Sequence, residues 1–147
     1  QQVPEKNIIL NEGCCPIHAQ INAKQVMELR AAHPEAKVLA HPECEPTVLE
    51  LADYIGSTAE IIAYAKSDSA EEYIVCTEYG VKYKLQQDNP QKRFYFPDPV
   101  PCCVGMKLNT LERLYTVLRD ETNEVLVTAE DRAKALFPLD KMLELAK

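Results

Sequence analysis

The residues best suited to chemistry are two cysteines, two histidines and a glutamate that lie in polar loops after short apolar stretches. Cys15 and His18 have the spacing of two local metal ligands, although a plain turn has the same spacing. His41 is separated from Glu43 by one proline, which places a substrate-binding ring beside a carboxylate suited to acid–base catalysis. A hydrogen-bonded histidine at a strand end explains His41 equally well. Cys103 lies far along the chain, so no local Cys-x-x-Cys motif exists.

The chain contains six cysteines, and their chemistry depends on the redox compartment. They are Cys14, Cys15, Cys44, Cys76, Cys102 and Cys103. No secretory signal is visible at the start of the sequence, which favours reduced thiols in the cytoplasm over disulfides. The cysteines are therefore interpreted as buried residues or metal ligands. Two alternatives to an enzyme stay open: a plain α/β binding domain with cysteines in its core, or a non-catalytic zinc-binding α/β module that uses Cys14, Cys15, Cys102 and Cys103.

A short polar segment, Gly56-Ser57-Thr58, precedes a predicted helix. Backbone N–H groups at a helix start are unpaired and carry the positive end of the helix dipole, so they suit a carboxylate or a phosphate. Serine and threonine are also ordinary helix caps, which makes this signal weak when taken alone. The segment nevertheless indicates an anion-binding position.

Apolar stretches alternate with helical patterns over the first two thirds of the chain. Strands are predicted at residues 7–10, 37–40, 54–55, 73–76 and 93–96, and helices at 22–33, 46–52, 58–64 and 79–87. This order predicts a parallel sheet covered by helices on both faces, with ligands at the carboxyl ends of the strands. Beyond residues 97–101 the pattern is purely helical: Thr110 and Thr128 start helices, and Pro138 is expected to interrupt the last one.

Composition excludes several classes of protein. The chain has 147 residues, and its 16 basic and 23 acidic side chains give a net charge of −7, which argues against a nucleic-acid partner. A hydrophobic content of 46% is typical of a globular domain, and no apolar stretch is long enough to cross a membrane. Because the sequence does not begin with methionine, we expect a processed chain or a piece of a longer one.

Several short segments, weak one by one, form a specific set when taken in order. They are Gly13-x-Cys15-Pro16-Ile17-His18, His41-Pro42-Glu43-Cys44-x-Pro46, Ala52-Asp53-Tyr54-Ile55-Gly56-Ser57-Thr58, Thr77-Glu78, Asn89-Pro90, Phe94-Tyr95, Cys103-x-Gly105-Met106-Lys107 and Thr110-Leu111. The ordered set spans essentially the whole chain and resembles the C-terminal half of the quinolinate synthase family, the iron–sulfur enzymes of NAD biosynthesis.

The resemblance implies a three-layer α/β/α fold with a short parallel sheet, one of three pseudo-symmetric domains, followed by a helical C-terminal tail. Residues 1–15 would end the preceding domain, residues 16–101 would form the third domain, and residues 102–147 would hold the cluster-ligand loop and a tail that packs on the missing first domain. Each domain of the family contributes one cysteine to a [4Fe–4S] cluster, and Cys15 and Cys103 correspond to two of these ligands. The third would lie in the N-terminal remainder of the same protein.

The resemblance also implies a reaction, the condensation of iminoaspartate with dihydroxyacetone phosphate to quinolinate, with an open iron of the cluster as Lewis acid. Glu43 would be the acid–base residue, and His18 and His41 would bind the substrate and help to move protons. Ser57 and Thr58 would bind a carboxylate or a phosphate. Cys14 and Cys102 depart from the family pattern by doubling each candidate ligand. The isolated chain is expected to be inactive, because it lacks the third cysteine.

Overall fold

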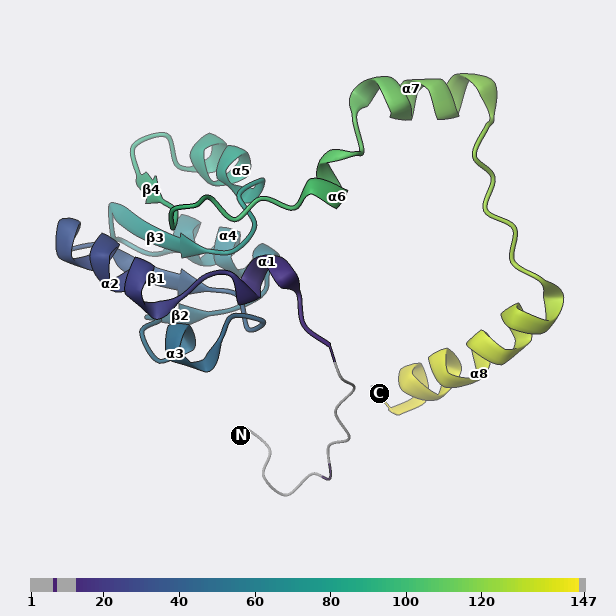
Figure 1. The fold of residues 1–147 in the computed structure, drawn as a ribbon, viewed down its shortest axis with the longest axis horizontal. Coiled ribbons are helices and arrows are strands. Elements are labelled where there is room, and N and C mark those ends of the chain that lie inside the picture. The colour runs from purple at the N-terminus through teal and green to yellow at the C-terminus, as the bar shows by residue number, and fades with distance from the viewer. Residues whose placement is uncertain (1–6, 8–12, 146–147) are drawn as a thin grey trace. The chain divides into compact units, whose positions relative to one another are not determined.

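The computed structural model describes residue 7 and residues 13–145, which divide into two compact units, Gln1–Val104 and Gly105–Lys147. The strand predicted at 7–10 lies, apart from Asn7, outside the described residues. The first unit contains a sheet of four parallel strands in the order β2-β1-β3-β4 (Figure 1). The strands are β1 (Lys37–Ala40), β2 (Tyr54–Ile55), β3 (Glu72–Cys76) and β4 (Arg93–Tyr95). The α/β fold with a short parallel sheet is therefore confirmed.

Two apolar cores lie on opposite faces of this sheet. Its helices are α1 (Pro16–Ala19), α2 (Ala23–Ala32), α3 (Pro46–Leu49), α4 (Thr58–Ser67) and α5 (Val81–Asp88). Val38 and Ala40 of β1 pack in one core with Val26 of α2. Leu39, which points to the other face, packs with Ile61 of α4. Both faces are thus covered, as predicted.

Local interactions determine where several helices begin and end. Asn22 and Ser57 each form a capping box, with Gln25 and Glu60 respectively, and so start α2 and α4. Helix α3 is shorter than predicted, because the N–H groups of Leu51 and Ala52 bond carbonyls three positions back, in a tight turn. Helix α5 begins later than predicted, at Val81.

The second unit is helical, as predicted. It holds most of α6 (Val104–Lys107), together with α7 (Leu111–Asp120) and α8 (Ala129–Leu145). Thr110 and Thr128 cap α7 and α8 by accepting the N–H groups of Arg113 and Asp131. The predicted interruption at Pro138 is wrong, since α8 runs through this residue without a break. The segment is exposed, so water can bond the carbonyl group that proline leaves without a partner.

The described helices include none that is both long and apolar enough to cross a membrane.

The carboxylate of Asp68, at the end of α4, ties the sheet to its helices. It accepts hydrogen bonds from Lys37 Nζ at 2.7 Å, from the Tyr73 hydroxyl at 2.9 Å and from the Ala70 N–H at 3.1 Å. These donors, Lys37 above all, hold the pKa of Asp68 at about 2. Because the ionised form is favoured in the folded state, this contribution to stability is present near neutral pH and is lost as the pH falls toward 2.

We therefore expect Asp68→Asn to lower the free energy of unfolding by about 1 kcal/mol near neutral pH, after allowance for solvent screening. Urea unfolding of the chain measures this loss, which should disappear at the acidic end of the range. Glu28→Gln removes only an exposed pair with Lys24 and serves as the control. An equal effect of both substitutions would contradict the role given to Asp68.

Candidate functional site

Most of the predicted site residues lie in loops at the carboxyl ends of the strands. His41 and Glu43 directly follow β1, Thr77 and Glu78 follow β3, and Ser57 follows β2. The short helix α1 lies in the same unit and carries His18. Because parallel strands end at the same edge, residues far apart in the sequence meet there.

His18 is the centre of the site. Its ring is 6% exposed, and both nitrogens are bonded: Nδ1 lies 3.0 Å from Glu43 Oε2, and Nε2 lies 3.0 Å from the Thr77 hydroxyl. A carboxylate accepts only, so Nδ1 carries the proton, and in the neutral ring Nε2 then accepts from Thr77. The ring is thereby held in one tautomer and one orientation.

His41 stacks on His18, with ring centroids 4.3 Å apart and planes inclined by 5°. Its Nδ1 accepts the backbone N–H of Glu43 at 3.2 Å, which leaves the proton of the neutral ring on Nε2. Burial lowers the pKa of His41, and the neighbouring His18 lowers it further. His41 is therefore a neutral donor near pH 7, suited to a carboxylate or a carbonyl oxygen.

Cys15 joins this group as the residue that caps α1. The Cys15 sulfur, a His18 ring nitrogen and a Glu43 carboxylate oxygen all lie within 4.8 Å of one another, as metal ligands would. A thiolate is the ligand that iron–sulfur clusters normally take, so Cys15 fits such a group. Its neighbour Cys14 is exposed and, in the described part of the chain, belongs to no such set of ligand atoms.

Cys103 is held separately, in the segment that follows β4. Its backbone N–H donates to Glu78 Oε1 at 3.1 Å, and the carbonyl of Pro101 accepts the N–H of Tyr79 at 2.8 Å. Cys103 is half-buried, whereas Cys102 is exposed. Since Thr77 bonds His18 and the next residue bonds Cys103, the loop after β3 contacts both parts of the candidate site.

Ser57 and Thr58 form the start of α4. The Ser57 hydroxyl accepts the N–H of Glu60, and a hydrogen bond from the Ser57 side chain lowers the pKa of the Glu60 carboxyl. Gly56 is required just before them, because a Cβ there would lie 2.8 Å from the Tyr54 ring. The N–H of Gly56 donates to the carbonyl of Ala40 at 3.1 Å, which ties this segment to the end of β1.

The remaining cysteines, Cys44 and Cys76, are both buried and belong to the core between the sheet and α2. Burial raises the pKa of Cys44 to about 11 and that of Cys76 to about 12. The Cys44 thiol donates to the carbonyl of Cys76 at 3.3 Å. Two neutral thiols that pack in a core are structural, and this agrees with the sequence interpretation.

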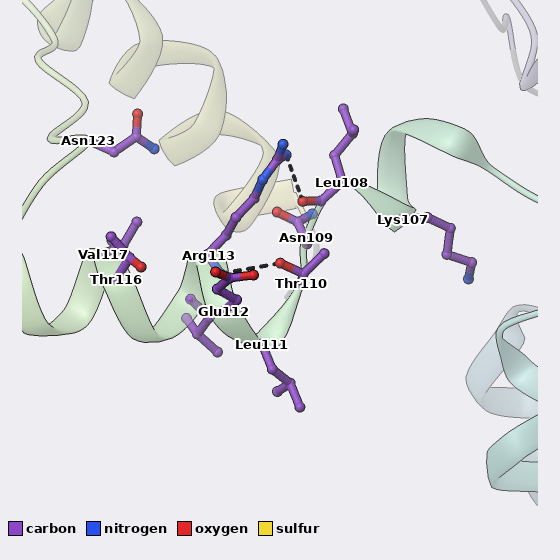
Figure 2. Close-up of a pocket in the computed structure, with 11 residues that line it drawn as sticks. Lys107, Leu108, Asn109, Thr110, Leu111, Glu112, Arg113, Thr116, Val117 and Asn123 are labelled. Carbon is purple, nitrogen blue, oxygen red and sulfur yellow. Dashed lines mark hydrogen bonds between the residues drawn. The ribbon is translucent and has the colours of Figure 1, made fainter.

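A separate hollow lies along α7 in the second unit (Figure 2). Its lining includes Leu108, Thr110, Leu111, Arg113 and Val117, and Arg113 donates to the carbonyl of Leu108 at 2.9 Å. The lining contains no cysteine or histidine. The hollow therefore offers neither a thiolate nor an imidazole, and Glu112 is the carboxylate that lines it.

Comparison with known proteins gives the family. A family model described as Quinolinate synthetase A protein matches residues 1–144. This chain belongs to the quinolinate synthase family. The quinolinate synthases of Fusobacterium nucleatum, Alkaliphilus metalliredigens and Aquifex aeolicus are 47%, 46% and 43% identical to it over 99% of this chain. The chain spans about half the length of these relatives, 47% to 48%, in agreement with the expected half-chain.

The family resemblance was thus predictable, but the role of Thr77 was missed. Thr77-Glu78 was matched as a motif of quinolinate synthases without a function for either side chain. The available signal was a threonine placed directly after a buried strand, where a hydroxyl must find a partner. Among the expected site residues, Cys15, His18, His41 and Glu43 come together. Cys103 and Ser57 lie in other loops, and Thr58 is the first residue of α4.

The lowered pKa of His41 gives a prediction for the pH dependence of stability. The folded state binds this proton less readily than the unfolded chain, so acidification below about pH 7 should lower the free energy of unfolding. Urea unfolding at several pH values measures the slope, and His41→Asn should reduce it. His33→Asn, a histidine stacked on Tyr95 outside the site, is the control. The assignment fails if His41→Asn leaves the slope unchanged.

Proposed function

We propose that this chain supplies the C-terminal half of a quinolinate synthase, which condenses iminoaspartate with dihydroxyacetone phosphate to quinolinate in the cytoplasm. The observation that supports it best is the group formed by Cys15, His18 and Glu43, on which His41 stacks. It combines a soft metal ligand, a carboxylate and two histidine rings in one place. Family membership makes this chemistry the first candidate.

Cys15 and Cys103 are the proposed ligands of a [4Fe–4S] cluster, with the third cysteine in the N-terminal remainder of the protein. Such a cluster, with one iron free of cysteine, supplies a Lewis acid that polarises a substrate hydroxyl or carboxylate. The half-buried positions of both cysteines support this choice over the exposed Cys14 and Cys102. The zinc alternative needs those two exposed thiols, and the group around Cys15 instead contains a nitrogen and an oxygen.

Glu43 is the proposed acid–base residue. Its side chain is 54% exposed, so one face of the carboxylate can reach a substrate while Oε2 stays bonded to His18. The other nitrogen of the His18 ring is hydrogen-bonded to Thr77, so the ring keeps its orientation and so does the carboxylate bonded to it. The loss of water in the condensation needs a proton carrier of this kind beside the reacting hydroxyl.

The substrate anions are assigned to the remaining polar groups. His41, neutral with its proton on Nε2, donates to a carboxylate without needing a positive charge. A carboxylate or a phosphate is assigned to Ser57 and Thr58, where the helix dipole and the N–H groups that the Ser57–Glu60 capping box does not use favour an anion. The substrates would thus lie between the loops after β1 and β2.

The helical tail is proposed to pack on the absent first domain. In α7, Leu111, Leu114, Tyr115 and Leu118 recur at helical spacing and are all exposed. An apolar stripe of this kind needs a partner surface, and the missing half of the protein is the expected one. The proposed division is residues 1–15, 16–101 and 102–147, and the compact units of the structure divide three residues later than its last boundary, between Val104 and Gly105.

The cysteine assignments can be tested in the full-length parent chain, purified without oxygen. Wild type should hold about four irons and four acid-labile sulfides per chain. Cys15→Ser and Cys103→Ser should lose most of both, while Cys14→Ser and Cys102→Ser, the matched neighbours, should keep them. Zinc in place of iron, or loss of iron from a neighbour variant instead, would overturn the assignment.

The role of Glu43 predicts a catalytic effect without loss of iron. Glu43→Gln in the full-length parent should lower kcat for quinolinate formation by about 10²- to 10⁴-fold, because the amide cannot exchange the proton. Glu45→Gln, an exposed neighbour in the same loop, should keep wild-type activity. Iron analysis and a quinolinate assay on the same samples separate chemistry from cluster loss. Wild-type kcat in Glu43→Gln would rule this role out.

A further inference from the structure

The loop after β3 contains a carboxylate that bonds two separate backbone segments. Glu78 Oε2 accepts the N–H of Gly80 at 2.6 Å, which closes the turn before α5. Glu78 Oε1 accepts the N–H of Cys103 at 3.1 Å, 25 positions along the chain. Both acceptors belong to one rigid group, so the position of Cys103 is fixed relative to that turn.

The segment that carries Cys103 is held by a few contacts outside regular secondary structure. Residues 96–103 form neither helix nor strand, and Cys103 is the last residue before α6. Pro97 and Pro101 are buried, and the carbonyl of Asp98 accepts a hydrogen bond from the Gln25 side chain at 2.7 Å. Nearer to Cys103 are the edge-on contact of Phe96 with Tyr79, the hydrogen bond from the Tyr79 N–H to Pro101 and the Glu78 contact. Of these, the Glu78 hydrogen bond is the one that bonds Cys103 itself.

The loop therefore connects the two proposed cluster ligands. Thr77 bonds His18, whose ring lies beside the Cys15 sulfur, and the next residue, Glu78, bonds the backbone of Cys103. We propose that Glu78 is a positioning residue that sets the Cys103 thiolate for cluster binding. This inference rests on the proposed function, because it takes Cys103 as a ligand.

The same carboxylate also affects the cluster through its charge. A negative group beside a ligand favours the oxidised form of a cluster, and net charge and hydrogen bonds both set cluster potentials. Glu78→Gln keeps one acceptor oxygen and removes the charge. The reduction potential should therefore move to a more positive value, a change that a purely structural role would not produce.

The test uses the full-length parent, purified without oxygen, as wild type, Glu78→Gln and Glu78→Ala. Substitution of a residue that orients a metal ligand typically lowers metal affinity by about 10- to 100-fold. Loss of the cluster to a chelator should therefore be roughly tenfold faster in Glu78→Gln than in wild type, and faster still in Glu78→Ala. Amide hydrogen exchange of residues 102–104 should speed up in both variants. Glu71→Gln, an exposed glutamate just before β3, is the matched control and should behave as wild type.

The outcomes separate this inference from the proposed function. A wild-type parent without iron and sulfide contradicts the proposed function, and amide exchange at residues 102–104 then still reports whether Glu78 holds the segment. A loaded wild type whose Glu78 variants keep its rate of cluster loss and its potential overturns the positioning role, even if exchange is faster. If Glu78→Ala does not fold, Glu78→Gln alone decides, since it conserves size and one acceptor.

Discussion

The candidate site depends on the bonding of one buried ring, His18. Its two nitrogens contact Glu43 from the loop after β1 and Thr77 from the end of β3, which are neighbouring strands. Rotation of the ring would break both hydrogen bonds at once, and burial makes each loss costly. His41 stacks on this ring and Cys15 lies beside it, so their placement follows from the same constraint.

The loops after the neighbouring strands each carry a different part of the candidate site. The loop after β1 carries His41 and Glu43, which would transfer protons. The loop after β2 leads to the start of α4, which suits an anion. The loop after β3 carries Thr77 and Glu78, which bond His18 and the backbone of Cys103. Each function is placed by a short loop on a packed parallel sheet, whose two cores resist movement. The N-terminal remainder would then need to add one ligand and a closing surface.

Local chemistry made much of this fold predictable. The helix starts at Asn22 and Ser57 can be predicted, because the residues of a capping box lie within four consecutive positions. The pairing of His18 with Thr77 was beyond such reasoning, since the two lie 59 positions apart and only the sheet brings them together. The predicted break at Pro138 was wrong because the rule considers the helix alone. It leaves the carbonyl freed by proline without a partner, whereas water can bond this carbonyl in an exposed helix.

The exposed tail also bears on how long such a chain survives. Leu111, Leu118 and Phe137 are 86%, 71% and 77% exposed, which is the kind of surface that chaperones and proteases recognise on unassembled proteins. Lifetime in the cell then depends on how quickly another surface covers these side chains. Assembly and turnover would thereby be coupled, because a chain whose tail stays uncovered would remain open to degradation.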